Sequence, residues 1–399
     1  MPSARLAFRR GQACLSVRVV LVIDDLRIAG AQRVIVQEAR ALHPHGIAFS
    51  VVALAPDPEP SFAPELAAIG VDVYHVPGRG LRDVSRMRTL ADLIQRLGPD
   101  LVHTHLTYAN IVGTLASRLA RRPSVATIHN VDSNQLKFTG PKRWLEGRVL
   151  RRWASRVAVV AEGARIPVAN TFCLPADDLL TVANGVDPYS VRLPVGYDRA
   201  AVRLALGANP DESLVCNVGR LDASKGQGHF LRALAQVLTR NPYGVRALLI
   251  GDGPRKNDLQ CLIANLELSN RVQLLGVRPD VAEIVAASDL FVLASLNEGL
   301  SQALLEAMVL GVPVVATDVG GTSDAVIPAA TGWLVPPADA RQLARAMEQA
   351  LGDRREAMRR AAAARQLVHR RFSLAGHLAG LEDLYRGVAA VSRPSRSIG

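Results

Sequence analysis

Short apolar runs recur along the chain at spacings that predict strands alternating with helices. In the first half, such runs predict strands at 17–23, 49–54, 71–76, 101–103, 125–128 and 157–161. Stretches rich in Ala, Leu and Arg lie between them and predict helices, for example at 33–42, 86–97 and 110–119. A second series of strands is predicted at 214–218, 247–250, 272–275, 290–293, 314–316 and 332–335. This alternation favours parallel sheets covered by helices on both faces.

Two such series predict two doubly wound, Rossmann-like domains of the α/β class. The periodicity is interrupted between the series by prolines and glycines, namely Pro188, Pro194, Gly196, Gly207 and Pro210. We therefore assign 1–16 to a disordered leader, 17–190 to the first domain and 191–365 to the second. A helix at 366–390 is expected to pack back on the first domain, and 391–399 to form a disordered tail.

The composition is consistent with this fold class and limits the function. Of the 399 residues, 49% are hydrophobic, which excludes general disorder. The four cysteines are far apart and show no metal or redox spacing, so we expect reduced core thiols in a cytosolic protein. No apolar run is long enough to predict a membrane-spanning helix. The run that follows Arg9 and Arg10 contains Arg18 and is interpreted as a buried strand, not as a signal peptide.

The net charge is +11, and residues 1–190 carry seven of these surplus positive charges. A basic surface favours anionic partners such as phosphate-bearing substrates, an acidic membrane surface or nucleic acid. Only four of the basic residues are lysines, so an arginine-rich genome composition explains the charge equally well. Because the sequence has no nucleic-acid-binding motif, we do not expect a nucleic-acid partner.

Glycine turns follow several strands of the second series. Arg220 and Lys225 flank the first turn, and a helix is predicted to begin near Gln227, so a diphosphate could meet two cations and a helix N-terminus there. Gly253 lies in the next turn and would let a backbone approach a ligand closely. Arg278 follows a third strand, whose end could hold a nucleobase. Taken singly, these loops are also explained as ordinary turns with solvated charges.

Two glutamates stand eight positions apart after the strand at 290–293. Glu298 precedes a predicted short helix and Glu306 lies inside it. At the carboxyl end of a parallel strand, two acids suit the hydroxyl groups of a sugar or ribose. Their side chains need not face each other, so a glycosidase-like acid–base pair is not implied. The alternative for Glu298 is an exposed glutamate that favours the helix dipole.

These motifs resemble, in order and spacing, those of glycosyltransferase family 4. The matching segments are Asn184-Gly185-Val186-Asp187, Gly219-Arg220-x₄-Lys225-Gly226, Gly251-x-Gly253-Pro254, Glu298-Gly299-x₆-Glu306-Ala307 and Gly320-Gly321. The resemblance extends over about residues 17–390. It implies a GT-B fold, with two domains facing a cleft, and retaining transfer from a nucleotide-diphosphate sugar without an essential metal or other cofactor.

The resemblance also implies roles for individual residues. Arg220 and Lys225 would hold the donor diphosphate. Glu306 would bind the ribose hydroxyls, and Glu298 the transferred hexose. Backbone groups of Gly299, Leu300 and Ser301 would bind phosphate or sugar. One departure from the family pattern is Asp324, which stands where glutamate is usual.

In the first half, residues 28–33 resemble the family's G-G-x-x-R loop, with Ala29 and Gln32 in place of a common glycine and acid. Gly30 would still admit a ligand, and Arg33 is placed on the acceptor side.

His129 resembles the family's active-site histidine, which bonds the sugar near its anomeric carbon. His103 and His105 are expected to shape the acceptor side, with a zinc site formed by all three histidines as the minor alternative. No evident nucleophilic carboxylate lies in this half, in agreement with front-face attack on the donor.

The acceptor is less defined. Residues 137–156 combine basic residues with Trp144 and Trp153, which suits an anionic membrane surface or, equally, an amphipathic helix packed on the sheet. Membrane binding would favour a lipid-linked acceptor or growing glycan in cell-surface polysaccharide assembly, at the inner face of the membrane. The alternatives to a glycosyltransferase are a sugar-nucleotide epimerase, a phosphorylase or a non-enzymatic basic binding protein.

Overall fold

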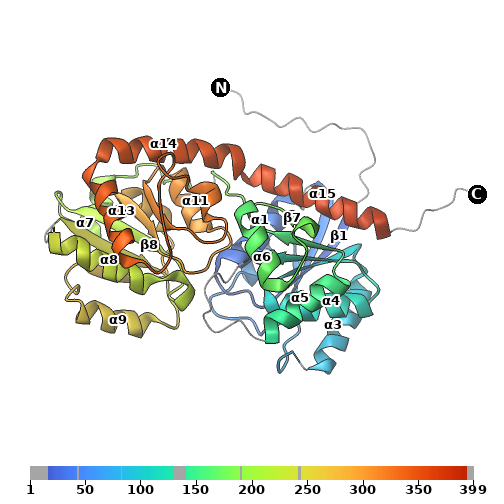
Figure 1. The fold of residues 1–399 in the computed structure, drawn as a ribbon. Coiled ribbons are helices and arrows are strands. Elements are labelled where there is room, and N and C mark those ends of the chain that lie inside the picture. The colour runs from blue at the N-terminus through green and yellow to red at the C-terminus, as the bar shows by residue number, and fades with distance from the viewer. Residues whose placement is uncertain are drawn as a thin grey trace, which may run out of the picture.

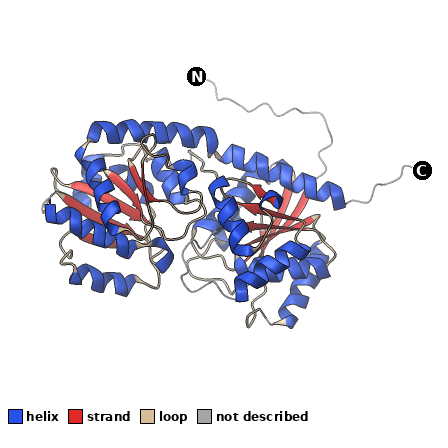
Figure 2. Ribbon diagram, viewed as in Figure 1, coloured by secondary structure: helices blue, strands red, loops and turns tan. Residues whose placement is uncertain are grey.

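The structure is a computed structural model that describes residues 17–42, 45–81, 83–129, 141–188, 191–240 and 244–392. The described chain forms two lobes, and each lobe is a parallel sheet with helices on both faces (Figures 1 and 2). The amino-terminal lobe contains β1 to β7 and the carboxyl-terminal lobe contains β8 to β13. The predicted leader, and the tail from residue 393 on, lie outside the described residues.

The amino-terminal lobe has a seven-stranded sheet in the order β3-β2-β1-β4-β5-β6-β7. Its strands are β1 Val17–Ile23, β2 Ile47–Ala53, β3 Asp72–His75, β4 Leu101–His105, β5 Ser124–Ile128, β6 Arg156–Val159 and β7 Leu179–Thr181. Its helices are α1 Gly30–Leu42, α2 Ala63–Ala68, α3 Val84–Leu97, α4 Thr107–Leu119, α5 Pro141–Trp153 and α6 Arg165–Phe172. Two apolar clusters cover the sheet, one under α1 and the other under α3 and α4.

The carboxyl-terminal lobe has a six-stranded sheet in the order β10-β9-β8-β11-β12-β13. Its strands are β8 Ser213–Val218, β9 Val245–Ile250, β10 Val272–Gly276, β11 Leu290–Leu293, β12 Val314–Thr317 and β13 Trp333–Val335. Its helices are α7 Arg199–Ala205, α8 Gln227–Arg240, α9 Lys256–Asn265, α10 Val281–Ala287, α11 Gln302–Val309, α12 Thr322–Ala325, α13 Ala340–Gly352 and α14 Arg354–Arg371.

In each sheet the strand order reverses at one point. β1 lies between β2 and β4, and β8 lies between β9 and β11, so consecutive crossovers leave in opposite directions. Such reversals open a crevice at the carboxyl ends of the strands, where α/β proteins bind ligands. The loops after β8 and β11 carry Lys225 and Glu298, while the loop after β4 begins next to His105.

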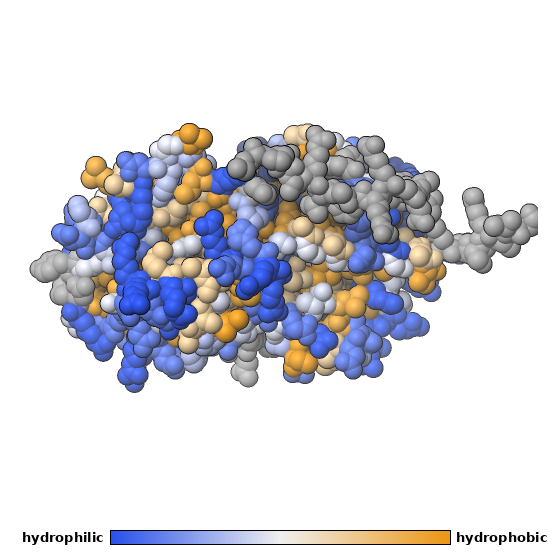
Figure 3. Space-filling model, turned by 90° about the horizontal axis from the view of Figure 1, so that it is seen from above, coloured by the Kyte–Doolittle hydropathy of each residue, from blue (hydrophilic) through white to orange (hydrophobic). Residues whose placement is uncertain are grey.

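The chain returns to the amino-terminal lobe at its end. Helix α14 packs on α11, and α15 (Leu374–Ser392) then crosses to the other lobe, as Figure 1 shows. Tyr385 of α15 is completely buried in the apolar cluster under α1. From the side on which α14 lies, hydrophilic and hydrophobic patches are intermixed on the surface (Figure 3). The fold therefore joins the end of the chain to the core of its first lobe.

Most predicted strands form within one or two residues of the expected positions, but three expectations need correction. β7 was not predicted, because it is a three-residue edge strand. The returning helix begins at Leu374 rather than at 366, since α14 remains packed on the carboxyl-terminal lobe. It also runs to Ser392, so residues 391 and 392 are helical rather than part of a tail.

The three described cysteines are unpaired, as predicted, but only Cys216 among them is a core thiol, buried in β8. Cys173 and Cys261 are free but exposed, because they lie at the end of α6 and on the outer side of α9. Cys14 lies outside the described residues. None of the described helices is both long and apolar enough to cross a membrane.

Candidate active site

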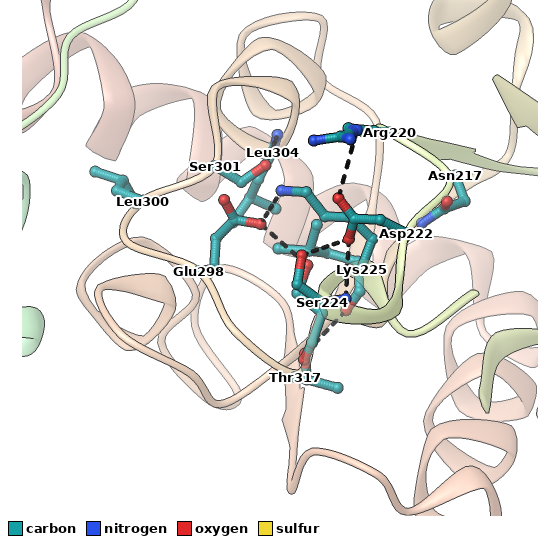
Figure 4. A network of polar contacts seen from close by, with 12 residues as sticks. Asn217, Arg220, Asp222, Ser224, Lys225, Glu298, Leu300, Ser301, Leu304 and Thr317 are labelled. Carbon is teal, nitrogen blue, oxygen red and sulfur yellow. Dashed lines mark hydrogen bonds and ion pairs between the residues drawn. The ribbon is translucent and has the colours of Figure 1, made fainter. Parts of the chain in front are cut away.

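The loop after β8 brings two cations to the carboxyl end of the sheet. Asp222 caps a short 3₁₀ turn by accepting hydrogen bonds from the backbone N–H and hydroxyl of Ser224, at 2.9 and 2.6 Å. Arg220 precedes the turn and is 45% exposed, with its Nε 3.8 Å from Asp222 Oδ2. Lys225 ends the turn and points back toward the loop after β11 (Figure 4). The turn thus fixes the backbone positions from which the Arg220 and Lys225 side chains extend.

Glycines let the loops after β8, β9 and β11 pack backbone against backbone. Gly226 has φ +62°, and a Cβ there would lie 2.0 Å from the carbonyl oxygen of Ala294. A Cβ on Gly253 would lie 2.4 Å from the carbonyl oxygen of Leu221. Loop packing therefore requires glycine at position 253, and the close approach of a ligand that the sequence suggested there stays a prediction.

Gly226→Ala is expected to lower the free energy of unfolding by about 3 kcal/mol, because the methyl group meets a carbonyl oxygen and the left-handed backbone is strained. Gly196 is the matched control. It has φ +83° and nothing within 4 Å of a built Cβ, so Gly196→Ala should cost only about 1 kcal/mol. Urea unfolding of the three proteins measures both values, and equal losses would contradict the packing argument.

The two glutamates lie in different surroundings. Glu298 is 6% exposed, and its Oε2 accepts hydrogen bonds from Lys225 Nζ at 2.5 Å and from the hydroxyl of Ser295 at 3.0 Å. Figure 4 shows the Lys225 and Glu298 side chains meeting from separate loops. The structure thus brings together a cation and an acid that are 73 positions apart in the sequence.

Glu306 contacts the other lobe. Its Oε1 lies 3.5 Å from Arg33 Nη1 at the start of α1, and burial raises the pKa of its carboxyl while Arg33 lowers it. Arg33 was predicted on the acceptor side, but the structure places it against the glutamate predicted to bind ribose. Gly30, also on α1, has nothing within 4 Å of a built Cβ, so the space beside it is open.

The segment between the glutamates contacts the amino-terminal lobe through its backbone. A Cβ on Gly299 would lie 1.9 Å from the carbonyl oxygen of His129. The Leu300 carbonyl accepts a hydrogen bond from Asn184 Nδ2 at 3.1 Å. The Ser301 hydroxyl accepts one from the backbone N–H of Leu304 and caps α11. These contacts hold the loop in place at the junction of the lobes.

Asp324 and Arg278 already have partners. Asp324 Oδ2 accepts a hydrogen bond from the backbone N–H of Gly163 at 2.9 Å, so the shorter acid still joins the two lobes. Arg278 makes a two-point ion pair with Asp280, at 2.8 and 2.5 Å. It follows β10, which is separated from β8 by β9, and in the described residues its guanidinium hydrogen-bonds to Asp280. Its predicted role near the nucleobase therefore stays a prediction.

The three histidines form a connected buried group. His105 Nδ1 lies 2.8 Å from His129 Nε2, and His103 contacts Thr127 and Tyr385, each at 2.7 Å. His103 and His105 are each 1% exposed, so neither lies at the surface, and their predicted part in shaping the acceptor side stays a prediction. The facing nitrogens of His105 and His129 bond to each other and both nitrogens of His103 bond to neighbours, and no group of three or more His, Cys, Asp or Glu in the described residues could hold a metal ion.

Acidification is expected to weaken the fold through these histidines. Burial lowers the pKa of His103 to about 3 and of His129 to about 4. Below about pH 6.5 the unfolded chain binds protons that the folded imidazoles do not, so each histidine lowers the free energy of unfolding by about 1.4 kcal/mol per pH unit until its folded pKa is reached.

Denaturant unfolding between about pH 6 and about pH 5, with wild type and His103→Asn, measures this effect. The variant lacks one of the groups, so its stability should fall less steeply with acidification. Burial raises the pKa of Asp24 to about 7, so this group increases the free energy of unfolding on acidification. The increase is the same in both proteins and cancels when their pH slopes are compared. Equal slopes would contradict the assignment.

Asp24 is a residue that the sequence analysis missed. It follows β1, and its carboxylate accepts hydrogen bonds from the backbone N–H groups of Ala109 and Tyr108, at 2.7 and 3.4 Å. It caps α4 beside Leu106, whose φ of 74° is rare for a residue with a side chain. An acid directly after a buried strand was the available signal, because such positions reach the carboxyl edge of the sheet.

Two parallel-sheet lobes that meet at their ligand-binding edges define a GT-B fold. This fold is shared with solved structures such as Anabaena HepE in complex with UDP-glucose, which is 25% identical with a TM-score of 0.82 over 92% of this chain and 99% of that chain. A sucrose-phosphate synthase from Thermosynechococcus elongatus has a TM-score of 0.80 at 22% identity, over 94% of this chain and all of that chain.

Family models assign the sequence directly. Residues 28–189 match the model for Glycosyltransferase Family 4, and residues 198–367 match the model for Glycosyl transferases group 1. The chain therefore belongs to glycosyltransferase family 4, among the group 1 glycosyltransferases, as its motifs indicated.

Curated relatives of this chain are also named as glycosyltransferases. An α-D-kanosaminyltransferase of Streptomyces kanamyceticus is 30% identical over 69% of this chain and 73% of its own length. A D-inositol 3-phosphate glycosyltransferase of Nocardia farcinica is 33% identical over 64% of this chain, and the match spans 59% of the relative. A UDP-Gal:α-D-GlcNAc-diphosphoundecaprenol α-1,3-galactosyltransferase of Escherichia coli is 29% identical over 64% of this chain and 67% of its own length.

Proposed function

We propose that this protein is a retaining glycosyltransferase that moves a hexose-type sugar from a nucleotide-diphosphate sugar to a glycan or lipid-linked acceptor. The contact between Lys225 and Glu298 carries the proposal. It sets a cation for the diphosphate beside an acid for the sugar at the reversal point of the sheet. Arg220 lies on the same turn, and Glu306 lies on the helix that follows the Glu298 loop.

In this reaction the bond between the anomeric carbon and the diphosphate oxygen breaks, and the acceptor oxygen bonds to the same face of the carbon. The acceptor's proton passes to the departing diphosphate. Arg220 and Lys225 stabilise the negative charge that develops on that diphosphate. Because these side chains supply positive charge, we propose that no metal ion is essential, and activity should persist when divalent ions are chelated.

Donor binding is tested by thermal unfolding with UDP- and GDP-sugars, because a ligand of the folded state raises the unfolding temperature. One of these donors should raise it and release nucleotide when an acceptor is added. The product should keep the anomeric configuration of the donor. Nucleotide release or sugar inversion without an acceptor would instead favour an epimerase, and binding of none of the donors would contradict the proposal.

The acceptor is proposed to be lipid-linked, as the name of the Escherichia coli relative states for that protein. Helix α5 supports this placement. Its Trp144 is 63% exposed, with the Arg148 guanidinium 5.4 Å from the centre of its ring, while Val149 and Leu150 on the other side are buried. Residues 137–140 of the predicted segment lie outside the described residues. An exposed face of arginines and tryptophans suits an anionic membrane surface.

Vesicle sedimentation tests this surface. Wild type should bind vesicles containing anionic lipid at low salt and lose binding at high salt. Arg148→Glu/Arg152→Glu should reduce binding by about tenfold or more, because each basic residue near the surface contributes about 1 kcal/mol. Arg355→Glu/Arg365→Glu on α14 makes the same charge change on the other lobe and should bind as wild type does. Equal losses in both variants would indicate a net-charge effect only.

A further inference from the structure

Three buried imidazoles lie in a row, which we call the histidine ladder. It consists of His103, His105 and His129. His103 lies against α15 through Tyr385, and its ring centroid is 4.0 Å from that of His105. His105 in turn contacts His129. The ladder therefore leads from α15 to the loop junction at Gly299, which packs against the His129 backbone.

The neighbours of His103 determine which of its ring nitrogens carries the proton. Tyr385 is completely buried, and burial raises the pKa of its phenol well above the usual value, so it keeps its proton. Its hydroxyl lies 2.7 Å from His103 Nδ1, and in the described residues this nitrogen is the acceptor for the hydroxyl proton. His103 therefore accepts at Nδ1 and carries its own proton on Nε2, which donates to the Thr127 hydroxyl at 2.7 Å.

The contact between His105 and His129 determines which ring nitrogen of each carries the proton. Burial holds the pKa of both His105 and His129 below the usual value, so both are neutral and share one proton across their 2.8 Å contact. His105 Nε2 is buried and has no hydrogen-bond partner in the described structure. A buried N–H without an acceptor is rarer than an unpaired acceptor. His105 therefore carries its proton on Nδ1 and donates it to His129 Nε2.

We infer that His105 is a positioning residue that fixes His129 as the tautomer with its proton on Nδ1, and that Tyr385 and His103 support it from α15. This inference rests on the proposed function and deepens it. In that tautomer His129 has a ring N–H to donate to an oxygen of the sugar. His129 is 8% exposed, the most exposed of the three histidines, and its backbone lies against Gly299, the residue after Glu298.

Paired substitutions separate positioning from packing. In His105→Asn, the amide nitrogen occupies about the place of Nδ1 and still donates to His129. In His105→Phe, the ring volume stays and the donor is lost. We expect His105→Phe to lower kcat by about tenfold or more with little change in the KM for the donor, and His105→Asn to restore most of it. Unchanged kcat in His105→Phe overturns the inference, and so does an equal loss in both variants.

A spectroscopic reading does not depend on activity. The imidazole ¹⁵N shifts of His129, assigned by comparison with His129→Gln, should report a proton on Nδ1 in wild type and a mixture of tautomers in His105→Phe. Tyr385→Phe keeps the buried ring but removes the hydroxyl, so it should move the shifts of His103 while kcat falls several-fold. A His129 protonated on Nε2 in wild type overturns the inference. If no donor is turned over but the shifts are as expected, the proposed function fails and the positioning stands.

Discussion

Lys225→Ala is expected to lower kcat/KM for the nucleotide-sugar by roughly 10²-fold or more, the usual loss for one donor aimed at a developing negative charge. Lys225 Nζ is held 2.5 Å from Glu298 Oε2, so its position is set before a diphosphate arrives. Only 24% of its side chain is exposed, so solvent ions cannot readily replace it. Steady-state kinetics with saturating acceptor measure the effect.

Lys256→Ala is the matched control for this substitution. Lys256 pairs with Asp252 at 3.3 Å on the surface of α9, and its side chain is 41% exposed. Its removal should change kcat/KM by less than about twofold, since exposed pairs of this kind contribute little. Lys225→Ala with normal folding and unchanged turnover would remove Lys225 from the mechanism.

Glu298→Gln is expected to lower kcat/KM by a similar factor, about 10²-fold, because the amide accepts hydrogen bonds from sugar hydroxyls less strongly than a carboxylate does. Glu298 uses Oε2 for Lys225 and Ser295, and in the described residues no side chain occupies Oε1. The substitution also leaves Lys225 without its anionic partner, which should lower the free energy of unfolding by about 2 kcal/mol.

The double variant Lys225→Met/Glu298→Gln separates catalysis from stability. Neither residue is then left as an unpaired charge, so the free energy of unfolding should recover by about 1 kcal/mol or more relative to Glu298→Gln. Activity should stay at the low level of the single variants. Recovery of activity together with stability would show that the pair acts only by holding the fold.

The fold was predictable from the sequence because its signals are local. Runs such as Val17–Ile23 and Leu290–Leu293 are buried on both faces and contain β-branched or aromatic residues, so they indicate strands without knowledge of their partners. The edge strand Leu179–Thr181 has only one fully buried residue and gave no such signal. The start of α15 was also missed, because helical periodicity does not reveal which lobe a helix contacts.

On the donor side, residues that lie within recognisable sequence motifs were predictable. The order of the glycine turns and acids indicated that Arg220, Lys225, Glu298 and Glu306 belong to one region, and the structure places Lys225 and Glu298 in contact. The packing of Gly253 against the Leu221 backbone was not predictable, because contact between two backbones cannot be seen from a single turn, and its predicted role in donor binding stays a prediction.

The amino-terminal half was less predictable because its contacts are long-range. Arg33 meets Glu306 across 273 positions, and His103 meets Tyr385 across 282. No periodicity or spacing reports such pairs. His103 and His105 end a strand that is buried along its whole length, and that burial, more than their polarity, decided where they lie.

A structure of the protein with UDP or GDP bound would locate the donor site. We expect the diphosphate to lie against Arg220 and Lys225 after β8, with the ribose hydroxyls on Glu306 and the sugar site open toward Glu298. A nucleotide bound elsewhere on the protein, with these four side chains unchanged and without contact to it, would overturn the proposed donor site.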